Sequence, residues 1–352
     1  MPRLRRVDCS GPGITRVRRG KGFSYFDEDG RPITEAAVVE RIRELGIPPA
    51  WQDVWICPYP LGHIQATGVD AAGRKQYLYH PEWRRRRDQQ KFDEMISFAR
   101  ALPALRERVA GDLRAGDELT RERVLACAIR LLDRGFFRIG TEEYATSNES
   151  FGLATIQKSH VRIEDGATMV FDYPAKHGKR RIQAVVDPLT VDVVAALKRR
   201  RGGRPDLLAF KEGGRWRDVK SGEINAYLKE ATGADYSAKD FRTWNATVLA
   251  ALGLAVAGEV AGTKTGRQRA ITRAVKEVAH YLGNTPAVCR ASYIDPRVFD
   301  AYEGGLIIRP ALEQAADTPA GVLPIHHRAV EEAVLDLIDE RATAPGVEKL
   351  AA

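Results

Sequence analysis

The chain has 352 residues, of which 44% are hydrophobic, and a formal net charge of +8, a balance typical of a globular protein that buries a core. No apolar run approaches the roughly 20 residues that span a bilayer, and the arginine-rich N-terminus lacks the apolar centre of a signal peptide. The four cysteines lie far apart without paired spacing, which argues against a disulfide framework or a zinc site. We expect a cytoplasmic protein with no membrane partner.

The positive charge is unevenly distributed along the chain. Residues 313–352 hold eight acidic and three basic side chains, a balance of −5, which leaves +13 on residues 1–312. The bases gather in four clusters, at residues 84–87, 176–181, 198–204 and 264–269. One such cluster is compatible with a solvated surface, but four together favour a polyanion, because each neutralised phosphate releases condensed counterions. We therefore expect a nucleic-acid partner.

Short alternating segments dominate the chain before residue 82. Two of them, at residues 22–26 and 31–33, flank a four-residue turn. Three more follow at residues 53–57, 63–67 and 76–80, separated by turns that contain proline or glycine. One helix is expected at residues 34–45. Residues 1–82 are thus predicted to form a small antiparallel β-sheet domain.

After residue 82 the apolar residues follow the helical period. The expected helices lie at residues 83–100, 103–113, 120–134, 189–200, 221–231, 239–253, 267–282 and 286–292. One β-hairpin interrupts them, because residues 169–173 and 180–186 enclose a turn that bears two lysines. The prediction is an α+β protein with a mainly α domain at residues 83–312.

An acidic linker and a helix are expected at residues 313–352. Val330, Val334 and Leu337 form one apolar stripe on this helix, which favours packing against the larger domain. An alternative is that its negative charge competes with the nucleic-acid partner for the basic surface. His326 and His327 lack nearby acidic partners, so we expect them to face solvent and not to bind a metal.

The segment before Tyr293 has the features of a helix start. Thr285 is a good N-cap and Pro286 suits the first helical position, so a helix beginning there carries Tyr293 about two turns later. Asn284 lies just before it. A tyrosine in such a place is more often a half-buried packing residue, and the segment alone does not decide between packing and chemistry.

Five motifs in this order resemble the type IB DNA topoisomerases of the bacterial, poxvirus-like branch. They are FFRIG at 136–140, AK at 175–176, KDFR at 239–242, GNTP at 283–286, and then Tyr293. Residues 55–77, with HIQ and GRKQY, resemble that family's DNA-clamping β domain. The order and spacing carry the resemblance over residues 20–305. It implies that the larger domain has the fold shared by tyrosine recombinases and type IB topoisomerases.

The resemblance implies an enzyme that relaxes supercoiled duplex DNA by cutting and resealing one strand, without ATP or a metal. Tyr293 corresponds to its nucleophile, which forms a 3′-phosphotyrosyl intermediate. A tyrosine with a pKa near 10 is ionised to about one part in a thousand at neutral pH, a deficit of roughly 4 kcal/mol. Arg138 and Arg242 match the family's arginine pair, which stabilises the phenolate and the charge on the phosphate oxygens.

Two further residues have implied roles in catalysis. Lys176, at the hairpin tip, matches the general acid that protonates the departing 5′ oxygen, although Lys179 is an alternative for this role. Asn284 stands where many relatives have histidine. An amide donates a hydrogen bond to a phosphate oxygen but shuttles no proton near neutral pH.

The resemblance also implies contacts to DNA outside the catalytic set. The candidates are Arg74, Lys75, Gln76, Tyr77, Lys179, Lys239, Lys264 and Arg267. Tyr77 alternatively packs within a sheet. Two lobes joined near residues 81–95 imply a monomer that clamps around duplex DNA, associated with the nucleoid, with a tip loop at residues 264–269 that orders on binding.

Two other functions stay open. A tyrosine site-specific recombinase shares the Arg, Lys, Arg and Tyr chemistry, but it usually carries histidine three residues before the second arginine, where this chain has Lys239. A non-catalytic DNA-binding protein needs the positive charge but not the ordered motifs.

Overall fold

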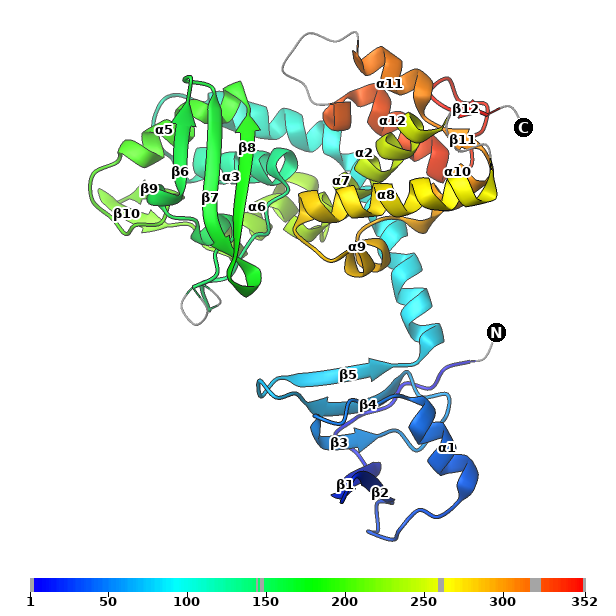
Figure 1. Cartoon of the computed structure of the whole chain (residues 1–352). Helices are drawn as coiled ribbons and strands as arrows, with labels where there is room; N and C mark the ends of the chain where they lie inside the picture. Colours follow the sequence, from blue (N-terminus) through cyan, green and yellow to red (C-terminus); the bar gives the residue numbers. More distant parts are fainter. Residues whose placement is uncertain (1–2, 144, 146–148, 259–262, 317–323, 351–352) are drawn as a thin grey trace. The chain divides into compact units, whose positions relative to one another are not determined.

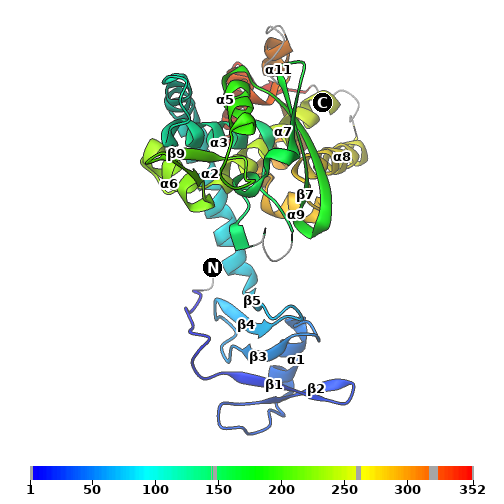
Figure 2. The same ribbon diagram turned by 90° about the vertical axis from the view of Figure 1, so that its left-hand side faces the viewer.

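The computed structural model describes residues 3–143, 145, 149–258, 263–316 and 324–350 (Figures 1 and 2). The chain divides into two compact units, Met1–Phe92 and Asp93–Ala352, because the contacts between residues are concentrated within each of them. Within the described residues, no helix is both long enough and apolar enough to cross a membrane. The expected combination of an N-terminal antiparallel sheet and a larger, mainly helical part is confirmed.

The first unit is built on a five-stranded antiparallel sheet with the strand order β2-β1-β3-β4-β5. The strands are β1 (Ile14–Arg19), β2 (Gly22–Phe26), β3 (Gln52–Ile56), β4 (Ile64–Val69) and β5 (Lys75–Tyr79). Helix α1 (Ala36–Glu44) covers the sheet and contributes Ile42 to a core formed with Ile14, Val54, Ile56 and Ala66. This core fixes which face of each strand is buried.

Strand β1 was not predicted. We expected residues 22–26 to pair with residues 31–33, but β2 pairs with β1 across a two-residue turn in which Gly20 has φ +56°. The expected turn is present in a shorter form, because a bridge joins Phe26 to Pro32 and Ile33 donates to the carbonyl of Tyr25 at 2.9 Å. Three of the six residues of β1 are arginines, so its apolar alternation is too weak to read from the sequence.

The second unit consists mainly of helices, and α2 runs into it from the first unit. The helices are α2 (Pro81–Arg114), α3 (Arg121–Gly135), α5 (Pro188–Arg199), α6 (Ser221–Thr232), α7 (Ala238–Ala257), α8 (Lys264–Leu282), α9 (Pro286–Ser292), α10 (Pro296–Glu303), α11 (Arg309–Ala316) and α12 (Arg328–Ile338). The expected break near residue 101 is wrong, because α2 continues through Pro103. Leu102, Leu105 and Val109 stay buried there, and their burial offsets the hydrogen bond that proline removes.

The predicted β-hairpin is confirmed, with longer strands. It is formed by β7 (Thr168–Ala175) and β8 (Lys179–Val186) around the short turn η3 (Lys176–Gly178), and β6 (Val161–Glu164) completes a three-stranded sheet. Two small sheets were not predicted, β9 (Ala209–Glu212) with β10 (Arg215–Asp218) and β11 (Leu306–Ile307) with β12 (Glu348–Lys349).

Helix α7 is the central element of the second unit. It contacts α3 on one side and α8, α11 and α12 on the other (Figure 1). Val330, Val334 and Leu337 of α12 are buried, as the apolar stripe predicted. The expectation that His326 faces solvent is wrong: it is buried near Asp133 and Arg134, and burial lowers its pKa to about 3.

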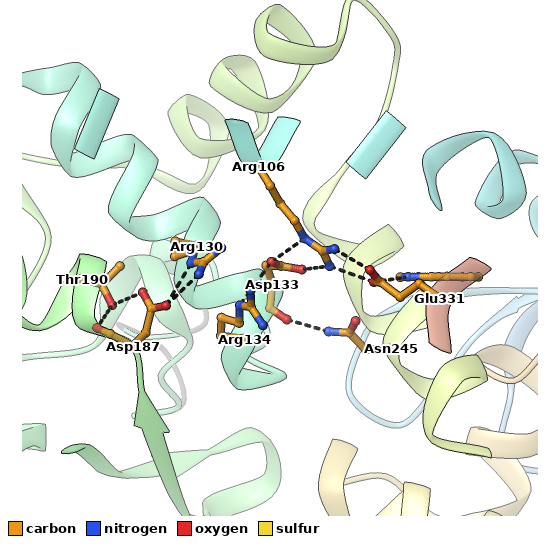
Figure 3. Close-up of polar contacts among 9 residues, drawn as sticks. Arg106, Arg130, Asp133, Arg134, Asp187, Thr190, Asn245 and Glu331 are labelled. Carbon is orange, nitrogen blue, oxygen red and sulfur yellow. Dashed lines mark hydrogen bonds and ion pairs between the residues drawn. The ribbon is translucent and has the colours of Figure 1, made fainter. Parts of the chain in front are cut away.

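A buried polar network joins α2, α3, α7 and α12 (Figure 3). Arg106 donates to both carboxylate oxygens of Asp133 at 3.0 and 2.9 Å and also to Glu331. Trp244 donates to Glu331 at 3.0 Å, and the Asn245 amide donates to the Asp133 carbonyl at 2.9 Å. Since each buried charge has an opposite partner, removing one leaves another uncompensated.

We predict that Glu331→Ala lowers the free energy of unfolding by about 3–5 kcal/mol, because Arg106 loses one of its two carboxylates and Trp244 loses its acceptor. The matched control is Glu332→Ala, which removes an exposed carboxylate paired with Arg328 and is expected to cost less than about 1 kcal/mol. Urea unfolding followed by circular dichroism measures both. Equal losses in the two variants contradict the role given to the network.

Candidate active site

The candidate site lies at the C-terminal end of α8, where three arginines donate to successive backbone carbonyls. Arg181 of β8 donates to His280 and Tyr281, Arg242 of α7 donates to Leu282, and Arg138 donates to Gly283. The last carbonyls of a helix have no partners within it and carry partial negative charge. This helix end therefore offsets part of the repulsion among the three guanidinium groups.

Arg242 is buried on the first turns of α7, with 4% of its surface exposed. Its Nη1 donates to the carbonyl of Phe136 at 2.6 Å and its Nη2 to that of Leu282 at 2.9 Å. Phe136 has a left-handed backbone, with φ +55°, where α3 ends. Burial and the neighbouring Arg138 lower the pKa of Arg242 to about 10, which keeps it charged at neutral pH.

Arg138 lies in the predicted FFRIG segment, which follows α3 without regular secondary structure. The backbone carbonyls of Arg138 and Ile139 accept from Leu153 and Ala154 at 2.8 Å each. Gly140 allows this pairing, because a Cβ there would lie 2.6 Å from the Cα of Gly152. The segment is thereby held so that Arg138 reaches the end of α8.

Asn284 is oriented by Arg138. A guanidinium nitrogen of Arg138 donates to Asn284 Oδ1, and because arginine has no acceptor, this contact fixes which end of the amide is the oxygen. Asn284 Nδ2 is buried and has no partner among the described residues. An unpaired buried donor is costly, so it marks a position where an acceptor is missing.

Tyr293 follows α9, which begins at Pro286 as predicted, with Thr285 as its N-cap accepting from Val288. The guanidinium carbon of Arg242 lies 5.3 Å from the centre of the Tyr293 ring. Burial raises the pKa of Tyr293, but the neighbouring charges of Arg242 and Arg138 outweigh it, so the pKa is lowered. The surroundings favour a phenolate.

A cavity of about 270 Å³ opens beside Arg138, Arg242 and Asn284, and Tyr293 is not among its described lining residues. The cations that line it are Arg138, Lys176, Lys179, Arg180, Arg181 and Arg242. No acidic side chain is among its described lining residues, so the cavity suits an anion. Both candidate lysines of the hairpin line it, and the choice between Lys176 and Lys179 stays open.

Lys264 and Arg267 do not line this cavity. Both lie in the first turn of α8, about 25 Å along the helix axis from its C-terminal end. Arg267 also donates to the carbonyl of Glu303 at 2.6 Å. The tip loop expected at residues 264–269 is wrong, because Thr263 caps α8 and these residues are helical. Lys239 is nearer, and its charge contributes to the lowered pKa of Tyr293.

The candidates in the first unit lie at strand β5 and the turn before it. Lys75, Tyr77 and Tyr79 are exposed on one face, with the two tyrosine rings stacked 6.1 Å apart. Gln76 points to the other face, and its amide donates to Asp70 at 2.9 Å. Arg74 is paired with the same carboxylate. Strand alternation thus separates Tyr77 from Gln76.

Sequence reasoning missed two residues that the structure places with these groups. Tyr79 continues the exposed face of β5 and was identifiable from its two-residue spacing to Tyr77. Arg181 was counted only as part of a basic cluster, whereas its side chain reaches the end of α8. In the structure, Arg181 lies on the inward face of β8, whereas its neighbour Arg180 is exposed.

Two parts of the chain match known protein families. Residues 80–304 match the catalytic core of eukaryotic DNA topoisomerase I, and residues 22–70 match the N-terminal domain of bacterial DNA topoisomerase IB. DNA topoisomerase 1B of Acanthamoeba polyphaga mimivirus is 28% identical over 296 residues, which cover 83% of this chain and 88% of that protein. DNA topoisomerase 1 of Schizosaccharomyces pombe is 27% identical over 161 residues, 46% of this chain and 19% of that protein.

We predict that Tyr293 titrates below the usual tyrosine value of 10. The difference in ultraviolet absorbance between the native chain and Tyr293→Phe, followed as the pH rises, isolates this one phenol. Arg138→Ala is expected to move the midpoint upward, because it removes one of the positive charges that favour the phenolate. A native midpoint at or above 10 contradicts the electrostatic account.

Proposed function

This chain belongs to the type IB DNA topoisomerases and relaxes supercoiled duplex DNA, and we propose that Tyr293 is the nucleophile that cuts and reseals the strand. The observation that carries the proposal is the convergence of Arg138 and Arg242 on the end of α8 beside the Tyr293 ring. Two guanidinium groups that stay charged bind phosphate oxygens and stabilise the developing charge. The same pair favours ionisation of the phenol.

In the proposed step, the phenol proton passes to solvent and the Tyr293 oxygen attacks the phosphorus of one phosphodiester. The bond from phosphorus to the 5′ oxygen breaks, a 3′-phosphotyrosyl bond forms, and Lys176 protonates the departing oxygen. After the broken strand has rotated, the 5′ hydroxyl attacks the phosphotyrosine and releases Tyr293. One ester replaces another in each direction, so the cycle requires no ATP.

Asn284 completes the proposed phosphate site. Its Oδ1 is held by Arg138 and its buried Nδ2 lacks an acceptor, so a phosphate oxygen would satisfy the amide. A neutral donor adds a hydrogen bond to the transition state without changing the charge of the site. We assign Asn284 to transition-state stabilisation and not to proton transfer.

The exposed face of β5 is the proposed DNA contact of the first unit. Lys75 offers a charge for the backbone, and the stacked Tyr77 and Tyr79 offer aromatic surface. Arg74 and Gln76 stay candidates although both contact Asp70. We propose a monomer that clamps the duplex and associates with the nucleoid, with residues 1–82, 83–312 and 313–352 as its parts.

We also propose that the larger domain has the fold that type IB topoisomerases share with tyrosine recombinases. A recombinase is therefore the competing function. The N-terminal match to the bacterial topoisomerase domain supports relaxation, and so does Lys239 in place of histidine. Supercoiled plasmid incubated with the chain in EDTA separates the two activities. Relaxed circles support the topoisomerase, and recombined circles support its competitor.

Tyr293→Phe is predicted to abolish relaxation while leaving duplex affinity and thermal stability nearly unchanged, because it removes the attacking oxygen and keeps the ring. Plasmid relaxation and fluorescence anisotropy with labelled duplex measure the two properties. The matched control is Tyr281→Phe, which changes an exposed tyrosine on α8 whose hydroxyl has no proposed role. A Tyr293→Phe protein that still relaxes plasmid would falsify the assignment.

Arg242→Ala and Lys176→Ala are both predicted to slow DNA cleavage, but for different reasons. Loss of Arg242 slows cleavage by about 10²–10³-fold, as for one lost oxyanion donor, and loss of a general acid costs about 10²–10⁴-fold. A substrate with a 5′-sulfur leaving group needs little protonation, so it should rescue Lys176→Ala but not Arg242→Ala. Single-turnover cleavage measures each rate. If Lys179→Ala alone is rescued, Lys179 is the acid instead.

A further inference from the structure

We propose that Arg181 is a positioning residue that holds the β7–β8 hairpin against the end of α8 and so sets the place of the general acid at the hairpin tip. The inference rests on the proposed role of Lys176. Arg181 follows Lys176 by five residues on the same hairpin, opposite Tyr173 on β7. Figure 1 shows β8 on the side of its sheet that faces the C-terminal end of α8.

The alternation of β8 separates two faces of the strand. Arg181, Gln183 and Val185 point inward, whereas Ile182 and Val186 are more than half exposed on the other face. Strand β8 is also the edge of its sheet, paired only with β7 among the described strands. An edge strand has no neighbour to fix its outer side, so its position depends on side-chain contacts to other elements.

Two inward side chains supply such contacts at different levels of the hairpin. The Gln183 amide donates to the carbonyl of Gly135, at the end of α3, and its oxygen accepts from the Tyr173 hydroxyl at 3.0 Å. Nearer the tip, Arg181 donates to the carbonyls of His280 and Tyr281. On β7, the Pro174 carbonyl accepts from the backbone of Phe151 at 2.9 Å. On the edge strand β8, Arg181 is the side chain nearest to Lys176 and Lys179 for which a contact outside the hairpin is described.

The end of α8 is shaped to receive this arginine. Gly283 has φ +63°, and a Cβ on it would lie 2.9 Å from the Arg181 guanidinium, so a glycine leaves room for the contact. Asn284, which immediately follows, is bound by Arg138. The end of α8 therefore contacts both the hairpin that carries the proposed general acid, through Arg181, and the arginines of the proposed phosphate site.

Arg180 is a matched comparison on the same strand. It has the same charge and lies next to Arg181, but its guanidinium is exposed and forms an ion pair with Asp172 of β7. That contact lies within the hairpin and does not join it to α8. Replacing Arg180 removes a positive charge without removing the anchor.

The test compares single-turnover cleavage of duplexes with a 5′-oxygen or a 5′-sulfur leaving group. If Arg181 places the general acid, Arg181→Ala slows cleavage of the oxygen substrate at least roughly 10-fold, a part of the roughly 10²–10⁴-fold that general acid catalysis contributes, and the sulfur substrate restores most of the rate. Arg181→Gln retains a donor to one carbonyl and should show a smaller defect with the same rescue. Arg180→Ala should show no difference in defect between the two substrates.

Lys176→Ala in the same experiment distinguishes failure of the inference from failure of the proposed function. Rescue of Lys176→Ala without rescue of Arg181→Ala or Arg181→Gln overturns the positioning role and leaves the general acid intact. No rescue of Lys176→Ala overturns the assignment of the acid itself. Thermal unfolding of each variant identifies a misfolded protein, in which case Arg181→Gln alone decides the question.

Discussion

The site depends on the balance between three clustered arginines and the C-terminal end of α8. Arg138, Arg181 and Arg242 come from separate parts of the chain and would repel one another in isolation. Each donates to a carbonyl among residues 280–283, where a helix end carries partial negative charge. Because no acidic side chain neutralises them among the described lining residues, their charge remains available for a phosphate.

Helix α7 connects this site to the stability of the second unit. Arg242 contacts Phe136 and Leu282, while Trp244 and Asn245, within the next turn, contact Glu331 and Asp133. The helix that carries a proposed catalytic arginine is therefore fixed by the buried network of Figure 3. The acidic C-terminal helix contributes Glu331 to this network, which supports a structural role for it in place of competition with DNA.

The sequence predicted those features that local chemistry determines. The start of α9 followed from Thr285 and Pro286, and the hairpin followed from two alternating segments around a turn. The arginine-rich β1, the continuation of α2 through Pro103 and the burial of His326 were missed, because tertiary packing outweighs local preference at each place. The role of Arg181 was missed because its contact is with residues about a hundred positions away in the sequence.

Covalent trapping tests the central claim most directly. Native protein is mixed with duplex DNA labelled on the strand to be cut, stopped with denaturant and digested, and the labelled peptide is identified by mass spectrometry. The account predicts a single peptide in which the oxygen of Tyr293 carries a DNA 3′-phosphate. A 3′-phosphate on another residue, or a 5′-phosphate on Tyr293, contradicts it.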